Sequence, residues 1–109
     1  MTNISDLTIS MHSISSRRTT YRFTVSYHEV TEEGVQNWSK DFAVRDNLGN
    51  PTQLGRRMGI KCRDKQIIPD TPKWKSIQEY LYRLAWKHAR NLSYRHGVNV
   101  IDNTTYHNN

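Results

Sequence analysis

The sequence predicts an α+β fold, in which a small antiparallel sheet of three to four strands packs against one long C-terminal helix. Apolar and polar residues alternate with period two over residues 21–27 and 38–44, as in strands with one buried face. Between Trp74 and Leu92, apolar residues recur at steps of three and four, as on one face of a helix. The length of 109 residues fits a single domain, which we assign to residues 1–98, followed by a polar, flexible C-terminal tail over residues 99–109.

The first part of the chain supplies the predicted sheet. A short strand is expected over residues 7–11, the clearest strand over 21–27, and the second member of a hairpin over 38–44. Glu29–Gln36 would form a long loop that contains an acidic break. The turn formers in residues 46–51 then predict a reversal of the chain.

Residues 52–68 join the hairpin to the helix. Residues 52–59 read as a basic loop spaced by glycines, and residues 60–68 fit either a third hairpin strand or a turn at their centre. The helix is expected to start at Pro72, because Thr71 can cap it and the missing N–H of proline needs no partner there. Gly97 is the predicted stop.

The predicted core lies between one face of the sheet and one face of the helix. The helix contributes residues at steps of three and four: Trp74, Ile77, Leu81, Leu84, Ala85, His88 and Leu92. The strands contribute alternating positions: Tyr21, Phe23, Val25, Tyr27, Phe42 and Val44.

Positive charge is concentrated in the second part of the chain. Residues 1–46 carry five bases and six acids, a formal charge of −1, whereas residues 47–109 carry eleven bases and four acids, a charge of +7. This asymmetry favours a polyanion or an acidic protein surface as the partner, although basic residues can also simply solubilise a chain.

Several classes of protein are disfavoured. No apolar run approaches the roughly 20 residues that a membrane-spanning helix needs, so we expect no membrane partner. The first ten residues lack the basic and apolar regions of a secretory signal. The single cysteine, Cys62, cannot form an internal disulfide, which favours a reducing compartment, and we expect a cytoplasmic protein.

Motifs for catalysis are missing from the sequence. It has no Cys-x-x-Cys, no phosphate-binding glycine loop and no Gly-x-Ser-x-Gly elbow, so we predict no catalytic residue, no metal site and no cofactor. Cys62 suits a small buried side chain as well as a nucleophile, and His88 suits a core histidine as well as a functional group. The remaining enzyme alternative is a small metal-dependent nuclease built from scattered carboxylates, Asp41, Asp46, Asp64 and Glu79.

A stripe of basic and aromatic residues lies opposite the apolar face of the predicted helix. It consists of Tyr80, Arg83, Lys87, Arg90 and Tyr94, at steps of three and four. Such bases can neutralise phosphates, and such aromatics can stack on unpaired bases.

Trp86 and Tyr82 lie beside this stripe on the helical wheel. Trp86 is therefore either exposed for stacking or packed, with Tyr82, against the flanking loops or the tail. The stripe itself also fits an ordinary solvated helix face.

A second basic cluster precedes the helix. Arg56 and Arg57 lie between Gly55 and Gly59, and Lys61, Arg63 and Lys65 follow. Glycines allow close approach to a phosphate and arginines bind it bidentately, although a flexible soluble loop would have the same composition. Both clusters would share one surface if the open face of the sheet presented Arg22, Lys40 and Lys61.

The order of elements, a hairpin-based sheet followed by one long helix, is similar in outline to two families of DNA-binding domains. These are the amino-terminal arm-binding domains of phage-type integrases and the AP2-type domains, and the outline also resembles small phage inhibitors of host defence. The predicted long loop over Glu29–Gln36 departs from the tight hairpins of the DNA-binding domains.

These observations predict a small, basic, non-enzymatic nucleic-acid-binding protein, with an accessory or regulatory role in a phage or mobile element. The ligand is DNA or RNA, and the predicted binding residues are Arg56, Arg57, Lys61, Arg63, Tyr80, Arg83, Trp86, Lys87, Arg90 and Tyr94. The alternative is a protein-interaction module or inhibitor that docks on a host protein or nucleoprotein complex through the same helix face.

Overall fold

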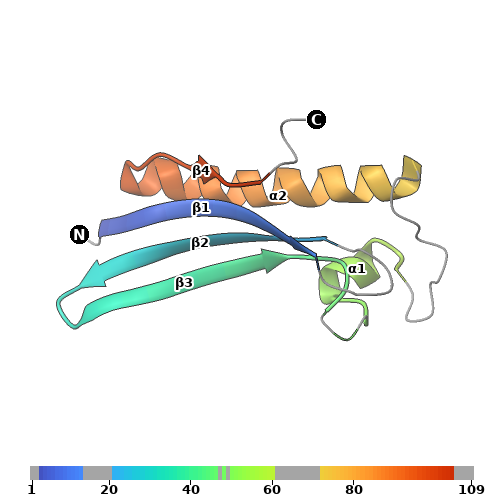
Figure 1. Cartoon of the computed structure of the whole chain (residues 1–109), viewed down its shortest axis with the longest axis horizontal. Coiled ribbons are helices and arrows are strands. Elements are labelled where there is room, and N and C mark those ends of the chain that lie inside the picture. The colour runs from blue at the N-terminus through green and yellow to red at the C-terminus, as the bar shows by residue number, and fades with distance from the viewer. Residues whose placement is uncertain (1–2, 14–20, 47, 49, 61–71, 105–109) are drawn as a thin grey trace.

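The computed structural model of the chain describes residues 3–13, 21–46, 48, 50–60 and 72–104. It contains a four-stranded sheet, a short helix and one long helix (Figure 1). The elements in chain order are β1 (Asn3–Ser13), β2 (Tyr21–Thr31), β3 (Gly34–Phe42), α1 (Gln53–Arg57), α2 (Pro72–His96) and β4 (Ile101–Asp102).

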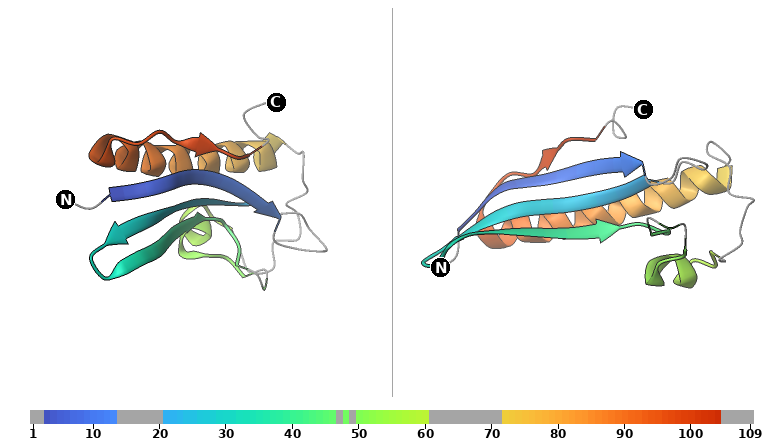
Figure 2. Two further views of the ribbon diagram at one scale, coloured as in Figure 1. Left: turned by 60° about the vertical axis from the view of Figure 1, so that its left-hand side comes forward. Right: turned by 60° about the horizontal axis from the view of Figure 1, so that its bottom comes forward.

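The sheet has the strand order β3-β2-β1-β4, and α2 crosses one of its faces (Figures 1 and 2). β1, β2 and β3 form antiparallel pairs, whereas β4 runs parallel to β1. The α+β arrangement predicted from the sequence is therefore confirmed. The other face of the sheet carries no helix of the described part of the chain (Figure 2).

The β2–β3 hairpin is longer and tighter than predicted. β2 continues to Thr31 and β3 begins at Gly34, so Glu32 and Glu33 alone form the turn. The expected long loop over Glu29–Gln36 is wrong, because polar residues there extend the ladder beyond the apolar positions that marked the strands. Gly34 has a φ of 126°, a backbone conformation that would be strained for a residue with a side chain.

β1 contains a bulge that explains an irregular apolar pattern. Its register against β2 shifts between Ser5 and Thr8, and Asp6 there adopts a φ of 55°. The extra residue reverses the alternation of side chains. Ile4, Leu7 and Ile9 consequently all face the core, despite a spacing of three and then two.

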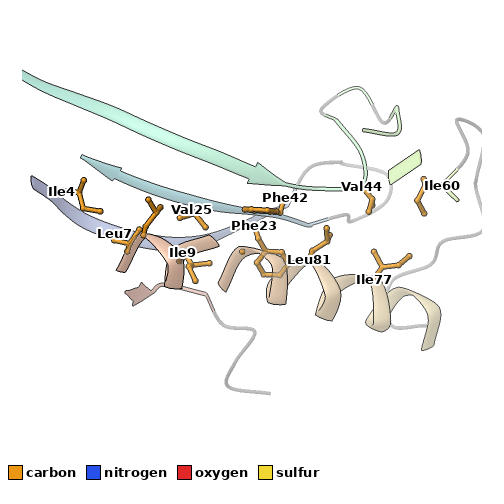
Figure 3. Packing of buried hydrophobic residues seen from close by; sticks show 13 residues of the cluster. Ile4, Leu7, Ile9, Phe23, Val25, Phe42, Val44, Ile60, Ile77 and Leu81 are labelled. Carbon is orange, nitrogen blue, oxygen red and sulfur yellow. The ribbon is translucent and has the colours of Figure 1, made fainter. Parts of the chain in front are cut away.

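The core lies between the sheet and α2. Figure 3 shows side chains from β1, β2 and β3 directed toward this helix. Of the predicted core, Phe23, Val25, Phe42, Val44, Ile77, Leu81, Ala85 and Leu92 are buried. Tyr27 and Leu84 are partly buried against the same cluster, whereas the side chains of Tyr21 and Trp74 lie outside the described part.

Residues 52–59 contain a helix rather than the expected loop. The Thr52 hydroxyl accepts a hydrogen bond from the backbone N–H of Gly55 at 3.0 Å and caps α1. Gly55 is required by packing, since a Cβ there would lie 2.1 Å from the carbonyl oxygen of Val44. The predicted strand or turn over residues 60–68 lies outside the described part except for Ile60, which is buried.

The chain returns to the sheet after α2. Gly97, with a φ of 67°, ends the helix as predicted, and its N–H donates to the carbonyl of Ser93 at 2.8 Å. β4 then pairs with Thr8 and Ile9 of β1. This strand falls within residues 99–109, the segment expected to be a tail, so residues 101–102 of that segment belong to the sheet.

Candidate nucleic-acid interface on the long helix

The basic-aromatic stripe, comprising Tyr80, Arg83, Lys87, Arg90 and Tyr94, is exposed along its whole length. Tyr80 is 44 % exposed and Tyr94 is 84 % exposed. Tyr80 and Tyr94, the ends of the stripe, are fourteen residues apart on one helix, or about 21 Å at 1.5 Å per residue. The fold thus holds three cations and two terminal aromatics in a line on a rigid element.

This helix carries a strong excess of positive charge. Between residues 75 and 96 it carries Lys75, Arg83, Lys87, Arg90 and Arg95 against a single acid, Glu79. Glu79 accepts a hydrogen bond from Arg83 at 2.8 Å in an i,i+4 ion pair. Within the described residues, the other four cations form no ion pair with an acid.

Trp86 is half-buried rather than exposed for stacking. Its indole Nε1–H donates to Oδ2 of Asp102 at 3.1 Å, and the Tyr82 hydroxyl donates to the same oxygen at 2.5 Å. β4 covers this flank of α2, which matches the alternative that Trp86 and Tyr82 pack against the tail. Trp86 is therefore not fully exposed for stacking, and its role as a binding residue stays a prediction.

Asp102 is the centre of this polar cluster. Its other oxygen, Oδ1, accepts from the backbone N–H of Thr104 at 2.9 Å and from the Thr104 hydroxyl at 2.6 Å. Burial alone would raise the pKa of the Asp102 carboxyl, but the hydrogen bonds from Thr104, Tyr82 and Trp86 together lower it. Burial first, and then the bond to Asp102, raises the pKa of Tyr82.

The second predicted cluster is only partly described. Arg56 and Arg57 are exposed in the last turn of α1, while Lys61, Arg63 and Lys65 lie outside the described residues. α1 lies beyond the end of β3, at the end of the molecule where α2 begins (Figures 1 and 2). Arg56 and Arg57 therefore do not lie beside the C-terminal half of the stripe.

The open face of the sheet is polar and nearly balanced in charge. Arg22 lies 3.8 Å from the carboxylate of Asp41, which also accepts a hydrogen bond from Thr24 at 2.8 Å. Lys40 pairs with buried Val25 and so lies on the opposite, helix-covered side. The strand alternation separates Arg22 from Lys40, so the condition under which both basic clusters would share the open face is not met.

The carboxylates considered for a nuclease have separate partners. Asp41 bonds Thr24, Asp46 accepts the backbone N–H groups of Leu48 and Asn50, and Glu79 pairs with Arg83. Asp64 lies outside the described residues. Within the part that is described, no group of three His, Cys, Asp or Glu residues is placed to hold a metal.

A further basic group, which the sequence did not single out, lies where α2 contacts β3. The Lys40 Nζ lies 5.6 Å from the centroid of the Phe42 ring, and the His88 ring centroid lies 5.9 Å from the same ring. Burial first, and then the positive charges of Lys40 and Arg95, lower the pKa of His88. The expected packing of His88 against the core is confirmed, whereas the convergence of two cations on it required the fold.

Comparisons with known proteins do not add to this evidence. No family model matches the chain, and neither a curated protein nor a solved structure matches it significantly. Among the described residues, no helix has the length and apolar character to cross a membrane. The chemistry of the chain's own residues must therefore carry any proposal about its function.

Proposed function

We propose that this protein binds nucleic acid through the basic-aromatic stripe of α2, as a small non-enzymatic accessory or regulatory protein of a phage or mobile element. The observation that carries the proposal is the exposure, on one rigid helix, of Arg83, Lys87 and Arg90 between Tyr80 and Tyr94. The helix carries only one compensating acid between residues 75 and 96.

The mechanism follows from the spacing of the cations. Arg83 and Arg90 are seven residues apart, which places them about 10 Å apart along the axis with Lys87 between them. Such a row can contact successive phosphates of one backbone and release their counterions. Tyr80 and Tyr94 at the two ends are placed to stack on bases or to pack against sugars.

The proposal is tested by reversing two charges on the stripe. Arg83→Glu combined with Arg90→Glu should weaken binding to a labelled oligonucleotide by at least about tenfold, because two phosphate contacts become repulsive. Fluorescence anisotropy measures the affinity, and circular dichroism checks that the exposed substitutions leave the helix intact.

The matched control reverses two charges elsewhere. Arg56→Glu combined with Arg57→Glu makes the same change in net charge on α1, at the end of the molecule where α2 begins. Equal losses for the two double variants would show an effect of net charge alone. A larger loss for the α1 variant would place the interface on α1 and contradict the proposal.

A second candidate function is docking on an acidic protein surface. The observation that favours it is Tyr94, which is 84 % exposed beside Arg90, since tyrosine and arginine are enriched at energetic centres of protein interfaces. Binding through phosphates should weaken steeply with salt, whereas an interface anchored by aromatics should weaken less.

A further inference from the structure

The line where the edge of β3 meets α2 brings together basic and aromatic residues from two elements. β3 is the outermost strand of the sheet, and Phe42, Lys40 and Trp38 alternate on its helix-facing side opposite Phe23, Val25 and Tyr27. α2 contributes His88, which packs on Phe42, and Arg95, which lies seven residues further along the same face.

The two rows start together where His88 packs on Phe42, and they separate toward the hairpin end of the sheet (Figure 1). α2 and β3 point in opposite directions (Figures 1 and 2), so the path from His88 to Arg95 follows the path from Phe42 back to Trp38. Lys40 and Trp38 lie about 7 and 13 Å from Phe42 along the strand. Arg95 lies about 10 Å from His88 along the helix, in the same direction.

The two cations of this line are not paired with an acid within the described residues, and the acid beside the line, Glu29, bonds the Trp38 indole. Lys40 and Arg95 take part in none of the ion pairs there, and both positive charges act on His88. Lys40 is exposed above the Phe42 ring, and Arg95 is exposed in the last turn of α2. Two unneutralised cations that converge from different elements form a site for an oxyanion.

Trp38 adds an aromatic surface to the end of the line. It is 48 % exposed, and its indole Nε1–H donates to the carboxylate of Glu29 at 3.3 Å, which fixes the ring on the strand. An indole held beside phosphate-binding cations is the arrangement by which proteins stack unpaired bases.

We propose that the β3–α2 line, formed by Lys40, His88, Arg95 and Trp38, is a track for a single nucleic-acid strand. Lys40 and Arg95 contact its phosphates, Trp38 stacks on a base, and His88 lies against the bound backbone. This inference rests on the proposed function and deepens it, because it assigns the ligand to unpaired rather than duplex nucleic acid.

The test compares a labelled oligothymidylate with a duplex of the same length. The wild-type protein should bind the single strand more tightly. Log affinity falls with log salt, and Lys40→Ala combined with Arg95→Ala should make this fall less steep by about 1.4, which corresponds to two lost phosphate contacts on a single strand. Lys75→Ala, at an exposed position in the first half of α2, is the control. It should reduce affinity less than Lys40→Ala alone or Arg95→Ala alone.

Trp38 is tested by two variants that retain an apolar side chain on the strand. Trp38→Leu should weaken binding of the single strand roughly tenfold, whereas Trp38→Phe should recover most of that loss because it can still stack. If the two variants bind equally well, Trp38 does not stack and the track is wrong.

His88 offers a readout that a merely structural role would not move. A phosphate placed between Lys40 and Arg95 should raise the pKa of His88 measured by NMR, since it offsets the two positive charges that lower that pKa. The resonance is assigned with His88→Gln, and an unchanged pKa on saturation with oligothymidylate would overturn the track.

The possible failures can be distinguished. If the wild type binds neither nucleic acid at low salt, the proposed function itself fails. If it binds, and the stripe variants weaken binding while the Lys40, Arg95 and Trp38 variants do not, only the track fails. Preference for the duplex would likewise overturn the track and leave the stripe in place.

Discussion

Asp102 shows how one carboxylate decides which aromatic residues of α2 are available for binding. It accepts hydrogen bonds from Tyr82, Trp86 and Thr104, and it lies on β4, which pairs with β1. These bonds hold the C-terminal strand against the flank of α2. The same bonds withdraw Trp86 from the exposed stripe.

Asp102→Asn should destabilise the protein by about 1–2 kcal/mol, because an amide cannot accept all of the hydrogen bonds that reach the two oxygens. The local effect is faster amide exchange at Asn103, whose N–H donates to the carbonyl of Ile9 at 2.8 Å. Unchanged exchange there would show that Asp102 does not hold β4.

The stabilisation by Asp102 depends on pH in a defined direction. Its pKa is lowered in the folded state from the ordinary value of 3.8, so the folded protein binds this proton less readily than the unfolded chain. The contribution is therefore complete above pH 3.8 and is lost as the pH falls through the folded-state value. The difference in the free energy of unfolding between wild type and Asp102→Asn should shrink over that acid range, and a constant difference would contradict the assignment.

At Gly55 the neighbouring backbone leaves no room for a side chain. In a helix interior alanine is ordinarily favoured over glycine by about 1 kcal/mol. Here a Cβ would lie 2.1 Å from the backbone oxygen of Val44, so Gly55→Ala should destabilise the protein, by about 1–3 kcal/mol. Thermal or denaturant unfolding measures the change, and a stabilised variant would show that α1 does not pack on Val44 in this way.

α2 combines the core and the candidate interface in one element. Leu81 is fully buried, whereas Leu84 is only partly buried at the flank of the helix. Leu81→Ala should therefore cost about 2–5 kcal/mol, and Leu84→Ala only about 1 kcal/mol. Equal losses in urea unfolding would mean that the helix is rotated from the orientation described.

The periodic elements could be predicted from the sequence, because alternation and helical spacing directly record which face is buried. The core positions of β2 and α2 and the exposure of the stripe follow from this pattern. The bulge at Asp6 breaks that record in β1. Around Glu32 and Glu33 no side chain of the hairpin is buried, and even the paired Val30 and Val35 are exposed, so no buried face marks the length of the hairpin.

The remaining parts of the candidate site depend on contacts between distant segments. Trp86 is half-buried because β4 returns to the sheet, and a two-residue strand has no periodicity to predict it. Lys40 and Arg95 approach His88 only because β3 and α2 run in opposite directions at one edge of the sheet. Nothing in the spacing of these residues along the chain indicates that they meet.

On the scale of the whole molecule, the described residues place their positive and negative charges on different surfaces. The long axis measures 48 Å, and the 25 residues of α2 extend along about 37 Å of it. The basic stripe follows this helix, while Glu32 and Glu33 lie at the hairpin turn and Arg22 is matched by Asp41 on the open face. The proposed function therefore expects a polyanion to approach α2 and its junction with β3 rather than the open face of the sheet.

The most direct test of nucleic-acid binding by α2 is the salt dependence of affinity for a labelled oligothymidylate, measured for the wild type and for Arg83→Glu combined with Arg90→Glu. We predict that log affinity of the wild type falls linearly and steeply with log salt. The fall for the variant should be less steep by at least about 1.4. No binding by the wild type at low salt, or a variant whose slope equals that of the wild type, would contradict the assignment of this helix face to nucleic acid.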